Sequence, residues 1–104
     1  MEFIETPVFT KIITKLIEDS LYMDLQEELL KNPRKGSVIP GSGGCRKLRF
    51  KSQTKGKRGG IRVIYYVMRE NRIYMLYAYS KVETEDLTKK QIKQLKKLIQ
   101  EVYL

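Results

Sequence analysis

The residues of this chain best suited to chemistry are cations on two predicted strands. In "CRKLRF", Cys45–Phe50, alternate side chains point the same way, so Lys47 and Arg49 share one face about 7 Å apart. A later apolar strand, "IRVIYYVM", carries Arg62. Strand positions are rigid enough to aim ammonium and guanidinium groups at phosphate oxygens. We therefore take these three as candidate phosphate-binding residues, although Arg62 could also be a surface arginine with only its stem buried.

The charge around these residues favours a polyanionic partner. From Gly41 to Val67 there is no acid, within a chain of 104 residues whose formal net charge is +9. Like charges destabilise a compact state, and mixed signs serve solubility better, so a merely soluble basic surface is the weaker interpretation. The cations of this stretch are Arg46, Lys47, Arg49, Lys51, Lys55, Lys57, Arg58 and Arg62.

Tyrosines accompany the cations. Tyr66 follows Arg62 on the same strand face, and Tyr79 precedes Lys81 by two residues. Single-stranded nucleic acid is bound by cations that pair with phosphates and by rings on which bases stack. We expect most strand tyrosines to be core residues and one or two to contact RNA. Lys81 could equally be a surface lysine at a strand end.

The composition excludes several kinds of site. The chain has no histidine and one cysteine, which excludes an ordinary zinc site, a Ser-His-Asp triad and a histidine base. We expect no metal and no cofactor. Cys45 cannot form an internal disulfide, although its cationic neighbours could lower its pKa. Without an apolar run of bilayer length or a basic signal segment, the sequence indicates a cytoplasmic protein that binds no membrane.

Two helices are predicted before the cationic strand. Thr6 and Pro7 suit an N-cap and a first helical position, and apolar residues follow at helical spacing. A second amphipathic helix begins near Asp19 and stops at Asn32-Pro33, because the residue before proline avoids helix. The short connection makes them a helical hairpin.

Strands and a final helix follow. Asn71 tolerates the positive φ of a hairpin turn, and Thr88 with Gln91 forms a capping box for the last helix. The predicted strands are residues 45–50, 61–68 and 72–80, with a further short strand at Val38–Ile39.

This order predicts one α+β domain over residues 1–104. We expect a small antiparallel or mixed sheet with an N-terminal helical hairpin and a C-terminal helix. The helices should lie mainly on one face, which would leave the other face free for Lys47 and Arg49.

Three motifs together resemble the RelE/HigB superfamily of bacterial toxins, in particular its HigB-like, phage-associated branch. They are "GSGGCRKLRF", "GKRGGIRVIYYV" and "IYMLYAYSKVETEDLT", and the resemblance covers nearly the whole chain. It implies a RelE-like fold and the toxin of a type II toxin–antitoxin pair, a metal-independent endoribonuclease that cuts mRNA in the ribosomal A site and so inhibits translation. The implied partners are a cognate antitoxin with a helix-turn-helix, the ribosome and mRNA, with operator DNA bound only through the antitoxin.

The resemblance also implies residue roles. The residues that match the family's catalytic positions are Arg62, Lys81, Arg49 and Lys47. The predicted contacts to RNA or ribosome are Arg46, Lys51, Lys55, Lys57, Arg58, Tyr66 and Tyr79. The chain departs from RelE-type toxins at Val82, where they carry an arginine, and near Leu87, where they carry a tyrosine. A lysine among cations has its charged form disfavoured, so Lys47 or Lys81 could serve as the base.

Two other functions fit the same fold. ParE-like relatives are non-enzymatic toxins that bind DNA gyrase, and a plain nucleic-acid-binding domain would also be basic. The four matched cations favour the nuclease.

Overall fold

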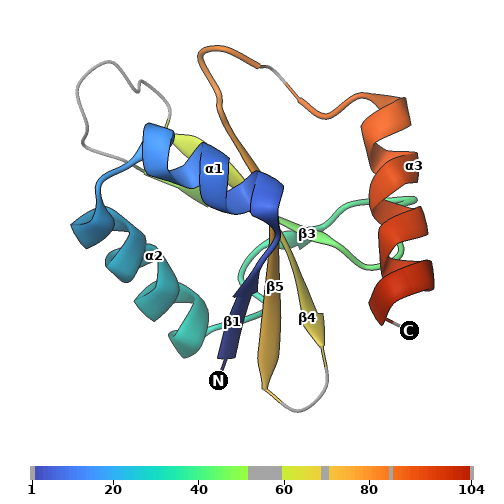
Figure 1. Cartoon of the computed structure of the whole chain (residues 1–104), viewed down its shortest axis with the longest axis horizontal. Helices are drawn as coiled ribbons and strands as arrows, with labels where there is room; N and C mark the ends of the chain where they lie inside the picture. Colours follow the sequence, from blue (N-terminus) through green and yellow to red (C-terminus); the bar gives the residue numbers. More distant parts are fainter. Residues whose placement is uncertain (1, 52–59, 69–70, 85, 104) are drawn as a thin grey trace.

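The computed structural model describes residues 2–51, 60–68, 71–84 and 86–103. Within them the chain forms a five-stranded sheet in the order β1-β5-β4-β3-β2 (Figure 1). The sheet is mixed, because β1 is parallel to β5 and the other pairs are antiparallel. The strands are β1 Glu2–Glu5, β2 Ser37–Val38, β3 Arg46–Phe50, β4 Ile61–Met68 and β5 Arg72–Ser80.

The helices begin where the sequence predicts. The Thr6 side chain accepts from the Phe9 amide, and Thr88 with Gln91 forms the predicted capping box. None of the helices within the described residues is long and apolar enough to cross a membrane. The helices are α1 Pro7–Leu16, α2 Asp19–Lys31 and α3 Lys89–Leu98, and a π-helix over Ile99–Tyr103 continues α3.

One prediction about the strands is confirmed, and one strand was not predicted. Asn71 has the predicted positive φ of 64° in the β4–β5 turn. The strand at Glu2–Glu5, however, is absent from the predicted order. Its two central apolar residues, between glutamates, are too few to show a strand pattern. It forms because the outer edge of β5 offers unpaired backbone groups, and residues Glu2 to Glu5 pair with Arg72 to Met75.

The two faces of the sheet carry different clusters. Leu48 and Val63 pack with α1 and α2 in one apolar cluster. Ile64 packs with Leu95 and Ile99 in a second cluster on the other face. As expected, α1 and α2 lie together on one face. The expectation that the other face is free is wrong, because the apolar stripe of α3 covers part of it (Figure 1).

A β-bulge in β5 changes which side chains share a face. Met75 and Tyr77 pair with adjacent residues of β4, so Leu76 between them has no partner. Met75 belongs to the first cluster, whereas Leu76, Tyr77 and Tyr79 all belong to the second. The extra residue thus turns Tyr79 onto the face of Arg62, which lies directly opposite it.

Gly60 fixes the start of β4, and its replacement should be costly. Its φ is +73°, and a Cβ there would lie 2.3 Å from the Phe50 carbonyl oxygen. Both the left-handed backbone and the clash oppose a side chain, so Gly60→Ala should lower the free energy of unfolding by about 3 kcal/mol. Urea unfolding followed by circular dichroism measures the change.

Gly41 supplies the matched control. Its φ is +79°, but a Cβ would meet its nearest atom, in Ile92, at 3.7 Å. Gly41→Ala should therefore show only the backbone cost, about 1 kcal/mol. Equal unfolding midpoints for the two variants would contradict the role of the Phe50 contact.

Candidate functional site

Three cationic residues, which we call the cation row, lie on the second face of the sheet: Lys47, Arg49 and Arg62. Arg49 of β3 is directly opposite Arg62 of β4, and Arg62 is directly opposite Tyr79 of β5. Directly opposed residues have Cβ atoms about 5 Å apart, and like charges so placed repel. Two planar guanidinium groups side by side suit an anion with several oxygens, such as a phosphate.

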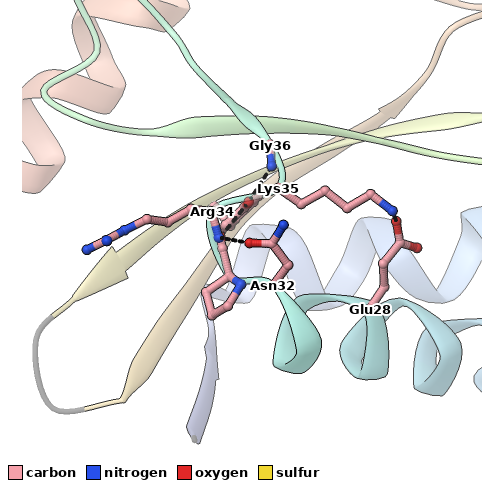
Figure 2. Close-up of polar contacts among 7 residues, drawn as sticks. Glu28, Asn32, Arg34, Lys35 and Gly36 are labelled. Carbon is pink, nitrogen blue, oxygen red and sulfur yellow. Dashed lines mark hydrogen bonds and ion pairs between the residues drawn. The ribbon is translucent and has the colours of Figure 1, made fainter.

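A hollow of about 320 Å³ lies beside this row. Its far wall is the connection between α2 and β2, including Lys35 and Gly36. Lys35 is exposed, and its Nζ lies 2.5 Å from Oε1 of Glu28 on α2 (Figure 2). Lys35 was not among the predicted site residues, because the spacing of "KNPRKG" gives no sign of where the connection runs. The remaining lining residues are Ser37, Lys47, Leu48, Arg49 and Arg62.

The connection is held by Tyr65 of β4. The Tyr65 hydroxyl donates to the Pro33 carbonyl at 2.8 Å and accepts from the Gly36 amide at 2.9 Å. Burial raises the pKa of Tyr65, so the hydroxyl stays protonated and can donate. A Cβ on Gly36 would lie 2.8 Å from that hydroxyl oxygen, so only glycine lets the chain approach so closely. Asn32 adds a bond from the Arg34 amide to its Oδ1 (Figure 2).

Arg46, a predicted RNA or ribosome contact, does not lie with the cation row. It alternates with Lys47 along β3 and therefore points to the opposite face. Its Nη1 donates to the Gly36 carbonyl at 2.7 Å and to the Arg34 carbonyl at 3.2 Å. The guanidinium therefore ties the wall of the hollow to β3.

Asp86, in the loop before α3, contacts Lys47 of the cation row and the neighbouring Tyr79. Its Oδ1 accepts from the Leu87 amide at 2.8 Å, from Lys47 Nζ at 3.2 Å and from the Tyr79 hydroxyl at 3.3 Å. The Leu87 amide, together with Lys47 and Tyr79, lowers the pKa of Asp86. Asp86 was not predicted either, since nothing in the nearby sequence relates it to β3 or β5.

Tyr79, another predicted RNA contact, presents its hydroxyl rather than its ring. The residue is only 4% exposed, so its ring faces are not open to a base. Burial and the Asp86 carboxylate raise the pKa of Tyr79 to about 12, against a smaller lowering by Arg62. At neutral pH the hydroxyl is therefore a hydrogen-bond donor and not a phenolate base.

The remaining residues are the predicted catalytic residue Lys81 and the other predicted contacts to RNA or ribosome. Tyr66 shares the face of Arg62, but it packs in the second apolar cluster, about 13 Å along the strand. Lys51 is exposed just beyond β3. Lys81 is exposed just beyond β5, and its amide donates to the Gly60 carbonyl at 3.3 Å. The predicted contacts Lys55, Lys57 and Arg58 lie outside the described residues.

Cys45 is a core residue. It is fully buried, and burial raises the pKa of its thiol to about 11, so the lowering that cationic neighbours could have caused is not seen. Nor do the described residues contain a group of three or more histidine, cysteine, aspartate or glutamate side chains able to hold a metal ion.

Comparison with known proteins agrees with this architecture. A family model described as the RelE toxin of the RelE/RelB toxin–antitoxin system matches residues 5–103. The structure is also similar to that of the Escherichia coli toxin RelE, solved in the free state as a double arginine-to-alanine mutant. The TM-score is 0.57 and the identity 19%, over 80% of this chain and 85% of that one, which is a similarity of fold.

The contact between Tyr65 and the connection can be tested by removing one oxygen. Tyr65→Phe leaves the Pro33 carbonyl and the Gly36 amide without this partner, so the free energy of unfolding should fall by about 1–3 kcal/mol. Amide exchange at Gly36, followed by NMR, should also become faster. Tyr66→Phe is the matched control on the same strand, because no hydrogen bond of the Tyr66 hydroxyl is seen within the described residues. Loss of equal stability in both variants would contradict the role of the Tyr65 hydroxyl.

Proposed function

The chain belongs to the RelE family of toxins of toxin–antitoxin systems, and from this we propose that it cleaves mRNA on the ribosome and thereby inhibits translation. The observation that carries the proposal is the directly opposed pair Arg49 and Arg62, beside Lys47 and an open hollow. Opposed arginines repel, and an anion bound beside both of them reduces that repulsion. A phosphate of the RNA backbone is such an anion.

The proposed reaction is an internal transfer at phosphorus. The RNA 2′-oxygen loses its proton to a base and forms a bond to the adjacent phosphorus, while the bond from phosphorus to the 5′-oxygen breaks and that oxygen takes up a proton. Negative charge grows on the non-bridging oxygens. Arg49 and Arg62 would stabilise that charge, because their forked donors can hold two oxygens in fixed directions.

Lys47 and Lys81 receive different roles in this scheme. Lys47 Nζ lies 3.2 Å from the Asp86 carboxylate, which restrains the lysine side chain, so we assign Lys47 to charge stabilisation. We assign Lys81, which matches a catalytic position of the family, to accept the 2′ proton. A site with so few acid–base groups suits an enzyme whose substrate is oriented by a large partner, because orientation can lower the activation barrier by about 7–11 kcal/mol.

The proposal extends to partners and setting. We propose a cognate antitoxin with a helix-turn-helix as the natural inhibitor, operator DNA bound only through that antitoxin, and the cytoplasm as the place of action. The route above needs no metal. The motifs around Cys45–Phe50 further favour the HigB-like branch of the superfamily.

Cleavage during translation is the first outcome to test. Induction of the protein alone should stop growth, and primer extension on a translated message should show new 5′ ends. The ends should vanish when the start codon is removed, because the cut requires a ribosome on the message. Arrested growth with intact mRNA would contradict the proposal and favour a gyrase-binding toxin, and binding of RNA without arrest would favour a plain binding domain.

Arg62 should affect the cleavage step that follows binding to the ribosome, rather than binding itself. Arg62→Ala should lower the single-turnover cleavage rate in the ribosome complex about a hundredfold, or about 3 kcal/mol, by loss of transition-state charge stabilisation. Ribosome affinity should change little, because the other cations of the surface remain. Both are measured on purified ribosomes programmed with a defined message.

Arg72→Ala is the matched control for Arg62→Ala. It removes the same side chain from the far end of β5, where Arg72 is exposed and its Nε lies 3.2 Å from Glu2 Oε1. Its cleavage rate should equal that of the unmodified protein. If Arg62→Ala also cleaves at the unmodified rate once bound, Arg62 is only part of a basic surface.

A further inference from the structure

A carboxylate in the middle of a surface for a polyanion calls for an explanation. Asp86 Oδ1 accepts from Lys47 of β3 and from the hydroxyl of Tyr79 of β5. These strands are not neighbours, because β4 lies between them. The two donors therefore flank the strand that carries Arg62, and a single oxygen atom links them.

Stability of the fold does not account for this contact. The Asp86 side chain is 63% exposed and that of Lys47 is 34% exposed. Ion pairs this open to water contribute little to folding. The amide of Leu87, the next residue in the chain, also donates to the Asp86 carboxylate. The orientation of the carboxylate is therefore set by its own loop and does not depend on Lys47 or Tyr79.

Affinity for RNA does not account for it either. A negative charge on this face repels phosphates, so Asp86 should weaken association with any polyanion. What the carboxylate adds is orientation: it restrains a long lysine side chain and fixes the Tyr79 hydroxyl, which donates to the same oxygen. Lysine is otherwise a flexible point charge with several rotatable bonds.

We propose that Asp86 is a positioning residue of the RNA-cleaving site, which holds Lys47 and Tyr79 on either side of Arg62 for the bound step and weakens RNA binding in doing so. This inference rests on the proposed function. It differs from autoinhibition, in which the carboxylate would simply occupy the phosphate position until RNA displaces it.

Asp86→Asn separates these two roles. The amide keeps the size of the side chain and an oxygen for the Leu87 amide, but it removes the charge that holds Lys47. The single-turnover rate on programmed ribosomes should fall about tenfold, while affinity for the same complex should rise about threefold. Asp86→Glu keeps the charge and should recover part of the rate.

Glu2→Gln is the matched control. It removes one negative charge from the ion pair with Arg72 at the far edge of the sheet, so the net charge changes equally. Rate and affinity should both stay at the values of the unmodified protein. An equal rise in affinity for Glu2→Gln and Asp86→Asn would show that only net charge matters and would overturn the local role of Asp86.

A measurement without RNA tests the contact itself. The ¹³Cζ signal of Tyr79, assigned with Tyr79→Phe, should shift in Asp86→Asn, whereas that of Tyr22, which donates to Glu5, should not. An unchanged Tyr79 signal would overturn the inference whatever the activity.

The kinetic outcomes are equally decisive. A rise in both rate and affinity in Asp86→Asn would replace positioning with autoinhibition, and an unchanged rate would exclude a role in the bound step. If the unmodified protein cleaves no message, the proposed function fails and this inference falls with it, even where the Tyr79 signal confirms the contact.

Discussion

The opposition of Arg49 and Arg62 is the constraint on which the candidate site depends. Two like charges on facing residues of neighbouring strands repel, so something else must hold the strands in this register. The other face does so. Leu48 and Val63, which alternate with these arginines, pair directly and are buried under α1 and α2. A slip of one residue would expose the apolar set, so the core enforces the arginine pair.

Both sides of this pair depend on contacts made elsewhere. On the β3 side, Tyr65 and Arg46 fix the connection that carries Lys35 to the hollow. On the β5 side, the unpaired Leu76 shifts the alternation so that Tyr79 faces Arg62. Without that extra residue, Tyr79 would share the face of Met75 and point toward α1 and α2.

Features set by nearby residues could be predicted from the sequence, and features set by contacts between distant residues could not. The helices and the alternation along β3 follow from local apolar spacing and caps, so they are predictable from the chain alone. The parallel pairing of Glu2–Glu5 and the placement of α3 on the second face depend on distant partners. The same holds for the missed residues Lys35 and Asp86, whose neighbours in space are remote in sequence. For Arg46, the alternation predicts a face opposite to that of Lys47, but the carbonyl groups of Arg34 and Gly36 that it binds lie in the connection before β2 and could not be predicted.

The exposed fraction of the side chains falls across the site from β3 to β5. The exposed side is suited to binding an anion, and the buried side is suited to stabilising charge that develops during the reaction. Arg49 is exposed, Arg62 is half-buried and Tyr79 is almost fully buried, in successive strands. An anion can therefore approach from the side of β3, where Lys35 and the hollow lie. Electrostatic interactions strengthen as water is excluded, so a charge that develops near Arg62 is stabilised more than one near Arg49. The same gradient keeps the Tyr79 hydroxyl protonated, so at the deepest part of the site its proton is donated to Asp86 while its oxygen can still accept a hydrogen bond.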